Sequence, residues 1–141
     1  WYVLDYPEHK GVQTWLRDLN HLYSSHAAMH RGDHQEAGLS WIAGNDSDAS
    51  VYAFVRRDPG SGAWLLFVSN LTPVYREGYS VGVPEAGSYR VLLNSDGGEY
   101  GGFGTMQTDL HSRPEESHGQ GQRLLLNLAP NSVLVLELER D

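Results

Sequence analysis

Hydrophobic residues recur at steps of three and four positions between His9 and Tyr23. This spacing places their side chains along one face of an α-helix, with polar residues on the opposite face. The pattern therefore predicts an amphipathic helix of about four turns, which the chain enters from a loop at Asp5–Pro7. The apolar face consists of Val12, Trp15, Leu16, Leu19, Leu22 and Tyr23.

After Gly32 the chain changes to short runs of β-forming residues that are separated by turn residues. The clearest hairpin connection is Asp58–Gly62, because Pro59 presets a turn dihedral and the two glycines tolerate positive φ. Strands and connections of this length are typical of an antiparallel β-sandwich, so the expected fold class is mainly β. The predicted strands are Leu39–Ala43, Ser50–Arg57, Ala63–Asn70, Gly78–Val83, Ser88–Asn94, Gln122–Asn127 and Ser132–Glu139.

The segment 97–121 is rich in glycine, histidine and acidic residues and predicts a long loop. At most a short strand is expected within it, at Phe103–Met106. The segment Gly97–Gly104 is rich in glycine, as phosphate-binding loops are. However, no Lys-Ser or Lys-Thr pair follows it, and the neighbouring acidic residues repel phosphate. We therefore predict no phosphate site in this loop.

Length and composition narrow the functional classes. A chain of 141 residues has the length of one domain and can bury a core of its own. The formal net charge of -8 and the single lysine, Lys10, leave no basic stripe for nucleic acid or anionic membranes. Cysteine is absent, which excludes disulfides and favours a reducing compartment. The chain begins at Trp1 without a charged leader or a long apolar run, so we expect neither a signal peptide nor a membrane span.

Three histidines, His26, His30 and His34, recur at every fourth position and would share one face if a helix continued that far. Gly32 and Asp33 weaken such a helix, and no glutamate completes an HExxH pattern. A hydrated helix end followed by a turn is the alternative to a metal site, and we adopt this interpretation. We therefore expect no metal.

Paired carboxylates occur at Glu115–Glu116 and at Asp46 and Asp48. Paired carboxylates act as catalytic groups only in a shaped, partly desolvated pocket. Both pairs lie in turn-like or loop-like sequence, so we interpret them as solvated residues. We expect no catalytic residue in this chain.

Three segments resemble, in the right order, the C-terminal region of the bacterial glycogen branching enzymes (1,4-α-glucan branching enzymes) of the α-amylase superfamily. They are LDYPEHKGVQTWLRDLNHLY from Leu4 to Tyr23, SNLTPVYREGYSVGVP from Ser69 to Pro84, and LNSDGGEYGG from Leu93 to Gly102. The resemblance covers essentially the whole chain, but only about the last fifth of such an enzyme. This chain differs from the usual sequence of the family at two places. His26–His30 stands where the family often has Pro-Ala-Leu-His, and Tyr75 stands where a proline is frequent.

The resemblance implies a bacterial cytoplasmic protein whose parent enzyme transfers α-1,4-glucan segments to 6-hydroxyl groups, making α-1,6 branches in glycogen. In that family the three catalytic carboxylates stand on a (β/α)8 barrel, upstream of the position that matches Trp1, and no cofactor is implied. Residues 1–32 would then be the end of the catalytic barrel, including its last helix, and residues 33–141 the C-terminal β-sandwich domain. The alternatives are a stand-alone glucan-binding β-sandwich module, or the same domain of a debranching or trehalose-releasing hydrolase, which lacks the TPVYREGY order of Thr72–Tyr79.

Aromatic rings are the candidates for direct glucan contact, because flat apolar sugar faces stack on exposed rings. The candidates beside turn-like sequence are Tyr75, Tyr79 and Tyr100, with Phe103 as a further one. Packing within the domain is the alternative role, and the more frequent role of such residues. The aromatic residues expected in the core, because they lie within strand patterns, are Trp41, Tyr52, Phe54, Trp64 and Phe67.

The predicted partners are the catalytic barrel of the parent enzyme and glycogen or α-1,4-glucan. Without the barrel, the helix must fold its apolar face onto the sandwich, pair it with a second copy or leave it exposed. Arg76 and Glu77 either fasten the domain to the barrel or form an exposed pair that contributes ~0 to 1 kcal/mol. The residues through which self-association is expected are Val12, Trp15, Leu16, Leu19 and Leu22.

Overall fold

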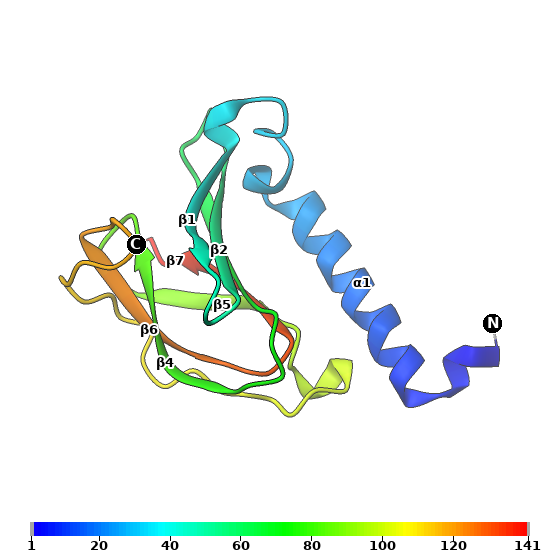
Figure 1. The fold of residues 1–141 in the computed structure, drawn as a ribbon. Coiled ribbons are helices and arrows are strands. Elements are labelled where there is room, and N and C mark those ends of the chain that lie inside the picture. Colours follow the sequence, from blue (N-terminus) through cyan, green and yellow to red (C-terminus); the bar gives the residue numbers. More distant parts are fainter. Residues whose placement is uncertain (1, 141) are drawn as a thin grey trace.

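Two antiparallel sheets dominate the computed structural model, which describes residues 2–140. The larger sheet has the strand order β1-β2-β3-β7-β5, and the smaller sheet pairs β4 with β6 (Figure 1). This arrangement confirms the antiparallel β-sandwich, and a strand occurs at every predicted place. The strands are β1 (Leu39–Asp46), β2 (Val51–Arg57), β3 (Trp64–Asn70), β4 (Arg76–Val83), β5 (Tyr89–Asn94), β6 (Gln122–Leu128) and β7 (Ser132–Leu138).

The main hydrophobic core lies between the two sheets, because alternate residues of each strand face inward. In β2 the fully buried residues are Val51, Ala53 and Val55, whereas the residues between them are at least partly exposed. Three leucines of β6 are buried with the same period. The period of two that predicts the strands is therefore also the pattern of burial.

The turn between β2 and β3 is the predicted hairpin. The Asp58 N–H donates to the Ala63 carbonyl at 2.8 Å, and Gly62 has a φ of 75°. The Asp58 carboxylate accepts hydrogen bonds from the Ser61 hydroxyl and the Gly60 N–H. These hydrogen bonds lower the pKa of Asp58 below its usual value. The turn residues therefore stabilise the hairpin through their own side chains.

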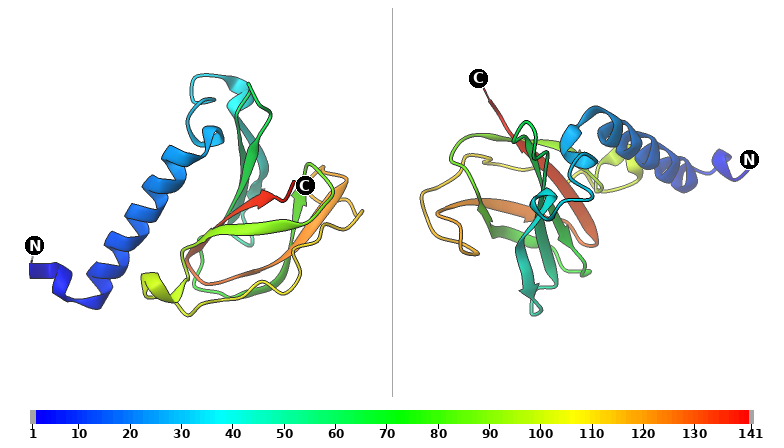
Figure 2. Two further views of the ribbon diagram at one scale, coloured as in Figure 1. Left: turned by 180° about the vertical axis from the view of Figure 1, so that it is seen from behind. Right: turned by 90° about the horizontal axis from the view of Figure 1, so that it is seen from above.

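Helix α1 (Pro7–Ser25) covers part of the outer face of the larger sheet, so the layers are helix, five-stranded sheet and two-stranded sheet (Figure 2). The helix begins with a proline, which is tolerated because the first N–H groups have no intrahelical partner. It ends where the His26 N–H donates to the Leu22 carbonyl at 3.0 Å. Leu22 belongs to a second hydrophobic core with Phe67 and Val135.

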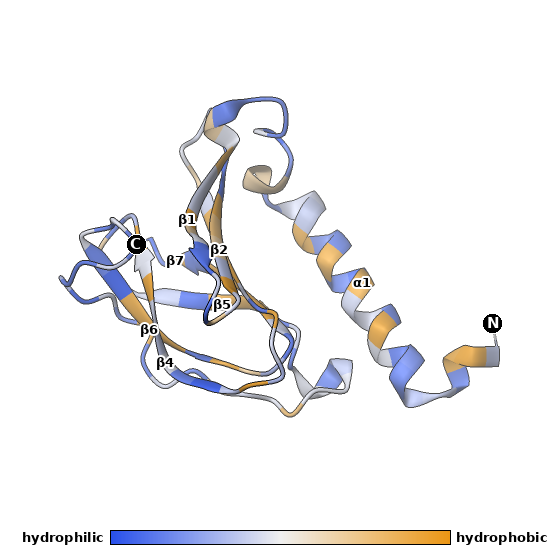
Figure 3. Ribbon diagram, in the orientation of Figure 1, coloured by the Kyte–Doolittle hydropathy of each residue, from blue (hydrophilic) through white to orange (hydrophobic). Residues whose placement is uncertain are grey.

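The apolar face of α1 is divided between the sheet and the surface. Trp15, Leu19 and Leu22 pack in the second core, whereas Val12 and Leu16 are exposed. At 100° per residue, Trp15 and Leu22 lie at one edge of the apolar stripe and Leu16 lies at the other. Apolar bands recur along the helix in Figure 3. The expectation that the helix folds onto the sandwich is thus met by half of its apolar face.

Trp41 and Tyr52 are not in the core, so that prediction is wrong for these two residues. They are 59% and 38% exposed, respectively. Tyr52 alternates with the inward-facing residues of β2, and Trp41 is paired with Phe54, so all three lie on the outer face. Phe54 is half-buried there, and the predictions for Trp64 and Phe67 are confirmed because both are buried. A strand pattern identifies two faces but not how far each one is covered.

The chain between β5 and β6 forms the predicted long loop. It contains a short 3-10 helix, η4 (Gly98–Tyr100), and Phe103–Met106 is not a strand. Isolated bridges, such as the one between Ser88 and His111, attach the loop to the sandwich. Among residues 2–140 we find no helix that is both long enough and apolar enough to cross a bilayer.

Candidate functional site

The segment Ser69–Pro84, whose order is the most specific in the sequence, is built around the buried side chain of Asn70. Its Nδ2 donates to the carbonyls of Val74 at 2.8 Å and Ala129 at 2.9 Å. Its Oδ1 accepts from the N–H of Thr72 at 3.2 Å and from the hydroxyl of the same residue at 2.8 Å. Because Asn70 is fully buried, these groups must be satisfied within the protein. The Asn-Leu-Thr-Pro order thus holds the connection between β3 and β4.

Tyr79 and Arg76 attach the second half of that segment to the end of β1. The Tyr79 hydroxyl donates to Oδ2 of Asp46, and the Arg76 guanidinium donates to the Ala49 carbonyl at 2.6 Å. Burial and the neighbouring carboxylate raise the pKa of Tyr79, and the hydrogen bond from Tyr79 lowers the pKa of Asp46. The guanidinium of Arg76 therefore binds within the domain, and Asp46 acts as a structural hydrogen-bond acceptor.

Asp96 organises the glycine-rich loop that follows β5. Its Oδ1 accepts from the Phe103 N–H at 3.1 Å, its Oδ2 accepts from the Thr105 N–H at 2.8 Å, and its main-chain oxygen accepts from the Gly104 N–H at 2.7 Å. Burial opposes the charge of this carboxylate, but the hydrogen bonds, above all those from Thr105, hold the pKa of Asp96 below its usual value. Asp96, the acidic residue of the Asn-Ser-Asp-Gly-Gly motif, therefore fixes the loop through hydrogen bonds to its main chain; we call this set of hydrogen bonds the clamp.

Tyr100, at the end of η4, connects this loop to α1. Its hydroxyl donates to Oδ2 of Asp18 at 2.9 Å, and its ring meets Trp15 edge-to-face at a centroid distance of 5.1 Å. Burial, followed by the bond to Asp18, raises the pKa of Tyr100 to about 12. A Cβ atom at Gly11 would lie only 2.5 Å from the Tyr100 carbonyl oxygen, so the helix can approach only because this residue is glycine. The segments Leu4–Tyr23 and Leu93–Gly102, which are far apart in the sequence, therefore contact each other.

The three tyrosines predicted to stack on glucan lie on different elements and contact different neighbours. The hydroxyls of Tyr79 and Tyr100 are bound within the domain, and both residues are half-buried. Tyr75 is exposed, and Phe103 is 98% exposed at the surface of the loop. Direct glucan contact by Tyr75, Tyr79 and Tyr100 stays a prediction.

The three histidines do not share a helical face, because α1 ends at Ser25. His26 lies 3.8 Å from Glu137, and the ring of His30 lies 5.4 Å from that of Tyr23. Within the described part of the chain, no three histidine, aspartate or glutamate side chains are placed to hold a metal ion.

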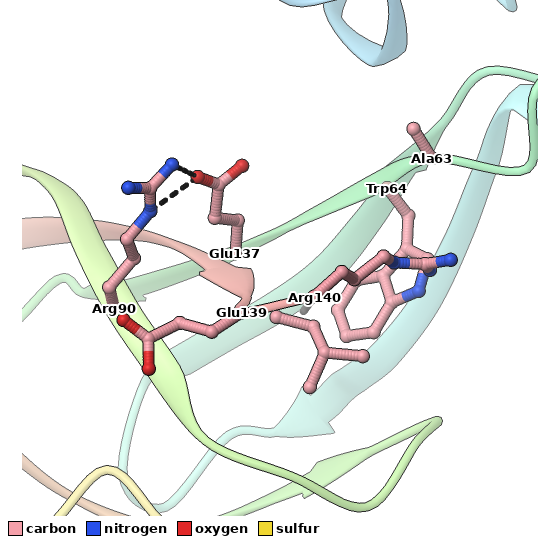
Figure 4. A pocket seen from close by; sticks show the side chains of 7 residues that line it. Ala63, Trp64, Arg90, Glu137, Glu139 and Arg140 are labelled. Carbon is pink, nitrogen blue, oxygen red and sulfur yellow. Dashed lines mark hydrogen bonds and ion pairs between the residues drawn. The ribbon is translucent and has the colours of Figure 1, made fainter.

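A cavity of 520 Å³ opens beside β7 (Figure 4). Arg90 and Glu137 form an ion pair in its wall. Trp64 also lines it, but this residue is buried and its indole N–H donates to Glu85 at 2.6 Å. Arg140 pairs with the same glutamate at 3.3 Å. We assign no chemistry to this cavity, because both of its arginines are engaged in ion pairs and its aromatic ring is covered.

An apolar groove of 360 Å³ runs along the exposed half of α1. Exposed apolar patches with polar residues at their rim are typical of protein contact sites. The groove is therefore suited to contact with another protein surface. The residues that line it are Val3, Leu4, His9, Val12, Gln13 and Leu16.

Comparison with known proteins identifies relatives over nearly the whole chain. A 1,4-alpha-glucan branching enzyme GlgB of Deinococcus radiodurans is 56% identical over 137 residues, which are 97% of this chain and 19% of that protein. The protein of the same name in Pseudomonas fluorescens is 47% identical over 96% of this chain and 18% of its own length. That of Aromatoleum aromaticum is 46% identical over 100% of this chain and 22% of its own length.

The chain thus spans about a fifth of the length of the curated relatives it matches. Its residues 41–139 match the protein family described as alpha amylase, C-terminal all-beta domain. The antiparallel sandwich built from β1 to β7 agrees with that description. The chain therefore belongs to the family of alpha amylase C-terminal all-beta domains.

Proposed function

We propose that this chain is the non-catalytic C-terminal domain of a 1,4-α-glucan branching enzyme of the bacterial cytoplasm. The observation that carries this proposal is the 56% identity, over 97% of the chain, to a relative of that name. The parent enzyme transfers α-1,4-glucan segments to 6-hydroxyl groups of glucan, and its catalytic carboxylates lie on the part of the barrel outside this chain. The proposal is preferred to a debranching or trehalose-releasing hydrolase, because the relatives described above carry the name of branching enzymes.

The divided apolar face of α1 supports a bridging role for this helix. One half of the face packs on the larger sheet, and the other half lines the apolar groove with Val12 and Leu16. We assign residues 1–32 to the end of the catalytic barrel and residues 33–141 to the sandwich, with α1 packed on both. Complete burial of one leucine or valine side chain contributes about 1.5–3 kcal/mol, so the groove can supply several kcal/mol to the contact.

The proposed activity is tested on the complete protein that contains this chain. Incubation with amylose should lower the absorbance of the iodine complex and create α-1,6 linkages, detected as short chains released by a debranching enzyme. The 141-residue chain alone should show no activity. Branching by the chain alone, or hydrolysis without branching by the complete protein, would overturn the proposal.

The bridging role is tested by placing a charge in the groove. Leu16→Glu should lower the free energy of unfolding of the complete protein by about 2–4 kcal/mol, because a leucine contact is lost and a carboxylate is buried. In the 141-residue chain the same change should cost less than about 0.5 kcal/mol, because Leu16 is exposed there. Lys10→Glu, on the exposed side of α1 opposite its apolar face, is the matched control. Equal effects of Leu16→Glu on both proteins would contradict the bridging role.

A second candidate function is direct binding of glucan by the domain itself. Exposed aromatic side chains favour it, since they can stack on sugar rings. Of the three tyrosines suggested by the sequence, Tyr75 has the ring that is available, while Tyr79 and Tyr100 have their hydroxyls bound within the domain.

A further inference from the structure

The segment Phe103–Met106, which we call the loop tip, carries two large apolar side chains that the domain leaves uncovered. Phe103 is 98% exposed and Met106 is 78% exposed. The tip belongs to the glycine-rich connection between β5 and β6, which is the yellow stretch of chain along one end of the sandwich in Figure 1. Phenylalanine and methionine are among the residue types most often buried in folded proteins. Two such side chains so close together form a candidate contact surface.

The loop tip is exposed, but its main chain is fixed. The clamp at Asp96 holds the N–H groups of Phe103 and Thr105. The main-chain oxygen of Asp96 also accepts from the Gly104 N–H at 2.7 Å, and a Cβ atom at Gly102 would lie only 2.2 Å from that oxygen. Because this backbone is ordered before any partner arrives, binding through the tip costs little conformational entropy. A fixed loop that presents uncovered apolar side chains is typical of a binding loop on a rigid scaffold.

The loop tip lies close to α1. Tyr100, which precedes Phe103 by three positions, bonds to Asp18 of this helix. Three residues of chain span at most about 11 Å, so the start of the tip is held within that distance of Tyr100. Figures 1 and 2 show the short helix η4 beside the N-terminal half of α1. Contacts within the domain therefore fix the place of the tip relative to α1.

The apolar groove opens on the neighbouring side of the same helix. Gly11 and Trp15 face the loop. Val12 and Leu16, one position further along in each case, line the groove. One position corresponds to a rotation of about 100° around the helix axis. A large partner that fills the groove and extends past it therefore meets the loop as well, so the tip continues the surface that we assign to the catalytic barrel.

The chemistry of the tip suits a protein surface. Neither Phe103 nor Met106 carries a hydroxyl, amide or charged group that could bind the hydroxyls of a carbohydrate. The main-chain N–H groups of residues 103–105 are already bonded to Asp96. The flexible thioether of methionine adapts to irregular apolar surfaces. The parent enzyme offers such a surface, because this chain matches only 19% of the length of the relative from Deinococcus radiodurans.

We propose that the loop tip is a second contact between the sandwich and the catalytic barrel, with Phe103 and Met106 as its apolar anchors. The proposal rests on the proposed function, which supplies the barrel as the partner. A contact through α1 alone opposes rotation around the axis of this helix only weakly. A second contact away from that axis opposes it directly, so the loop fixes the orientation of the sandwich on the barrel.

The contact is tested without a variant by oxidising methionine with dilute hydrogen peroxide, in the 141-residue chain and in the complete protein that contains it. Oxidation of a thioether follows its exposure to solvent, so Met106 should be oxidised at least about tenfold more slowly in the complete protein. Mass spectrometry of the peptide that carries Met106 measures the rate. Met29, the other methionine of the chain, packs against the second hydrophobic core and is the internal reference, with equal rates in both proteins.

A variant measures what the contact contributes. Phe103→Ala should make the complete protein unfold at least about threefold faster at a fixed high temperature, followed by circular dichroism, because the barrel loses an anchor. In the 141-residue chain the same change should leave the melting temperature as in the wild type, since Phe103 is 98% exposed there. Leu39→Ala is the matched control and should behave like the wild type in both proteins. Leu39 is 41% exposed and begins β1 at the opposite end of the larger sheet.

Equal oxidation of Met106 in both proteins, or a complete protein whose unfolding Phe103→Ala does not accelerate, overturns the proposal. Protection of Met106 in the 141-residue chain by added glycogen would identify a glucan as the occupant instead, and protection that rises with the concentration of the chain would identify a second copy. The two proposals fail separately. Branching by a complete protein in which Met106 is oxidised as fast as in the chain removes only this contact, whereas protection of Met106 without branching removes only the proposed function.

Discussion

The clamp at Asp96 offers a sharp test of how the glycine-rich loop is held. We consider Asp96→Asn, which keeps the shape of the side chain but removes its charge and replaces one carboxylate oxygen by an NH2 group. In the wild-type chain the two oxygens accept the N–H groups of Phe103 at 3.1 Å and Thr105 at 2.8 Å. The asparagine can accept only one of them, so the other N–H would face a second donor.

The expected cost follows from these contacts. Hydrogen bonds to charged groups contribute about 1.5–3 kcal/mol each, and a buried donor without a partner costs about 1–3 kcal/mol. Asp96 is buried, so solvent cannot replace the lost acceptor. We therefore expect Asp96→Asn to lower the free energy of unfolding at pH 7 by about 2–4 kcal/mol.

The difference between the wild type and Asp96→Asn should also depend on pH. Burial opposes the charge of Asp96, but the hydrogen bonds lower its pKa in the folded state below the value of about 3.9 for an unfolded chain. A lowered folded pKa gives stability that is present above the unfolded pKa and is lost as the pH falls through the folded pKa. The difference in free energy should thus be largest above about pH 5 and shrink below about pH 4.

Urea denaturation followed by tryptophan fluorescence, at pH 7 and at pH 3, measures both effects. Asp48→Asn, in an exposed turn, is the matched control and should change the free energy by less than about 0.5 kcal/mol. Amide exchange at Thr105 or at Phe103 should accelerate in Asp96→Asn, because one of these two N–H groups loses its acceptor. Equal stability of Asp96→Asn and Asp48→Asn at pH 7, or a difference that does not shrink in acid, would refute the reasoning.

Three further predictions concern the other structural contacts. Asn70→Leu should cost about 3–5 kcal/mol in urea denaturation, because the carbonyls of Val74 and Ala129 and the N–H of Thr72 lose their partner; a cost below 1 kcal/mol would contradict this. Gly11→Ala should lower the melting temperature, although alanine favours a helix by about 1 kcal/mol, because its Cβ meets the Tyr100 carbonyl; a higher melting temperature would exclude that close approach. Tyr79→Phe should cost about 1–2 kcal/mol and raise the pKa of Asp46 in an NMR titration, so an unchanged pKa would argue against the hydrogen bond.

Most of the fold can be predicted from local patterns. A helix at Pro7–Ser25 follows from apolar residues at steps of three and four, and the hairpin at Asp58 follows from its proline and glycines. The specific order of Ser69–Pro84 can be recognised, but its reason cannot be derived from the pattern alone. Asn70 is explained only when the carbonyl of Ala129, 59 positions away, reaches its side chain.

Long-range contacts decide what surrounds the aromatic residues that the sequence singles out. Tyr79 and Tyr100 lie beside turn-like sequence, yet their hydroxyls bind Asp46 and Asp18 on other elements. Trp41 lies within a strand pattern, yet α1 does not reach it. Trp41 stands on β1, which lies at the edge of the larger sheet and has a neighbouring strand on one side only.

The sequence by itself determines the position of α1 and of the seven strands, because these depend on neighbours within a few positions along the chain. It also determines the family, through the order of residues in segments such as Ser69–Pro84. Only the tertiary structure decides which apolar faces are covered. The helix buries Leu22 and leaves Leu16 exposed, and the larger sheet buries Phe67 and leaves Trp41 exposed, because coverage depends on the relative placement of elements that are far apart in sequence.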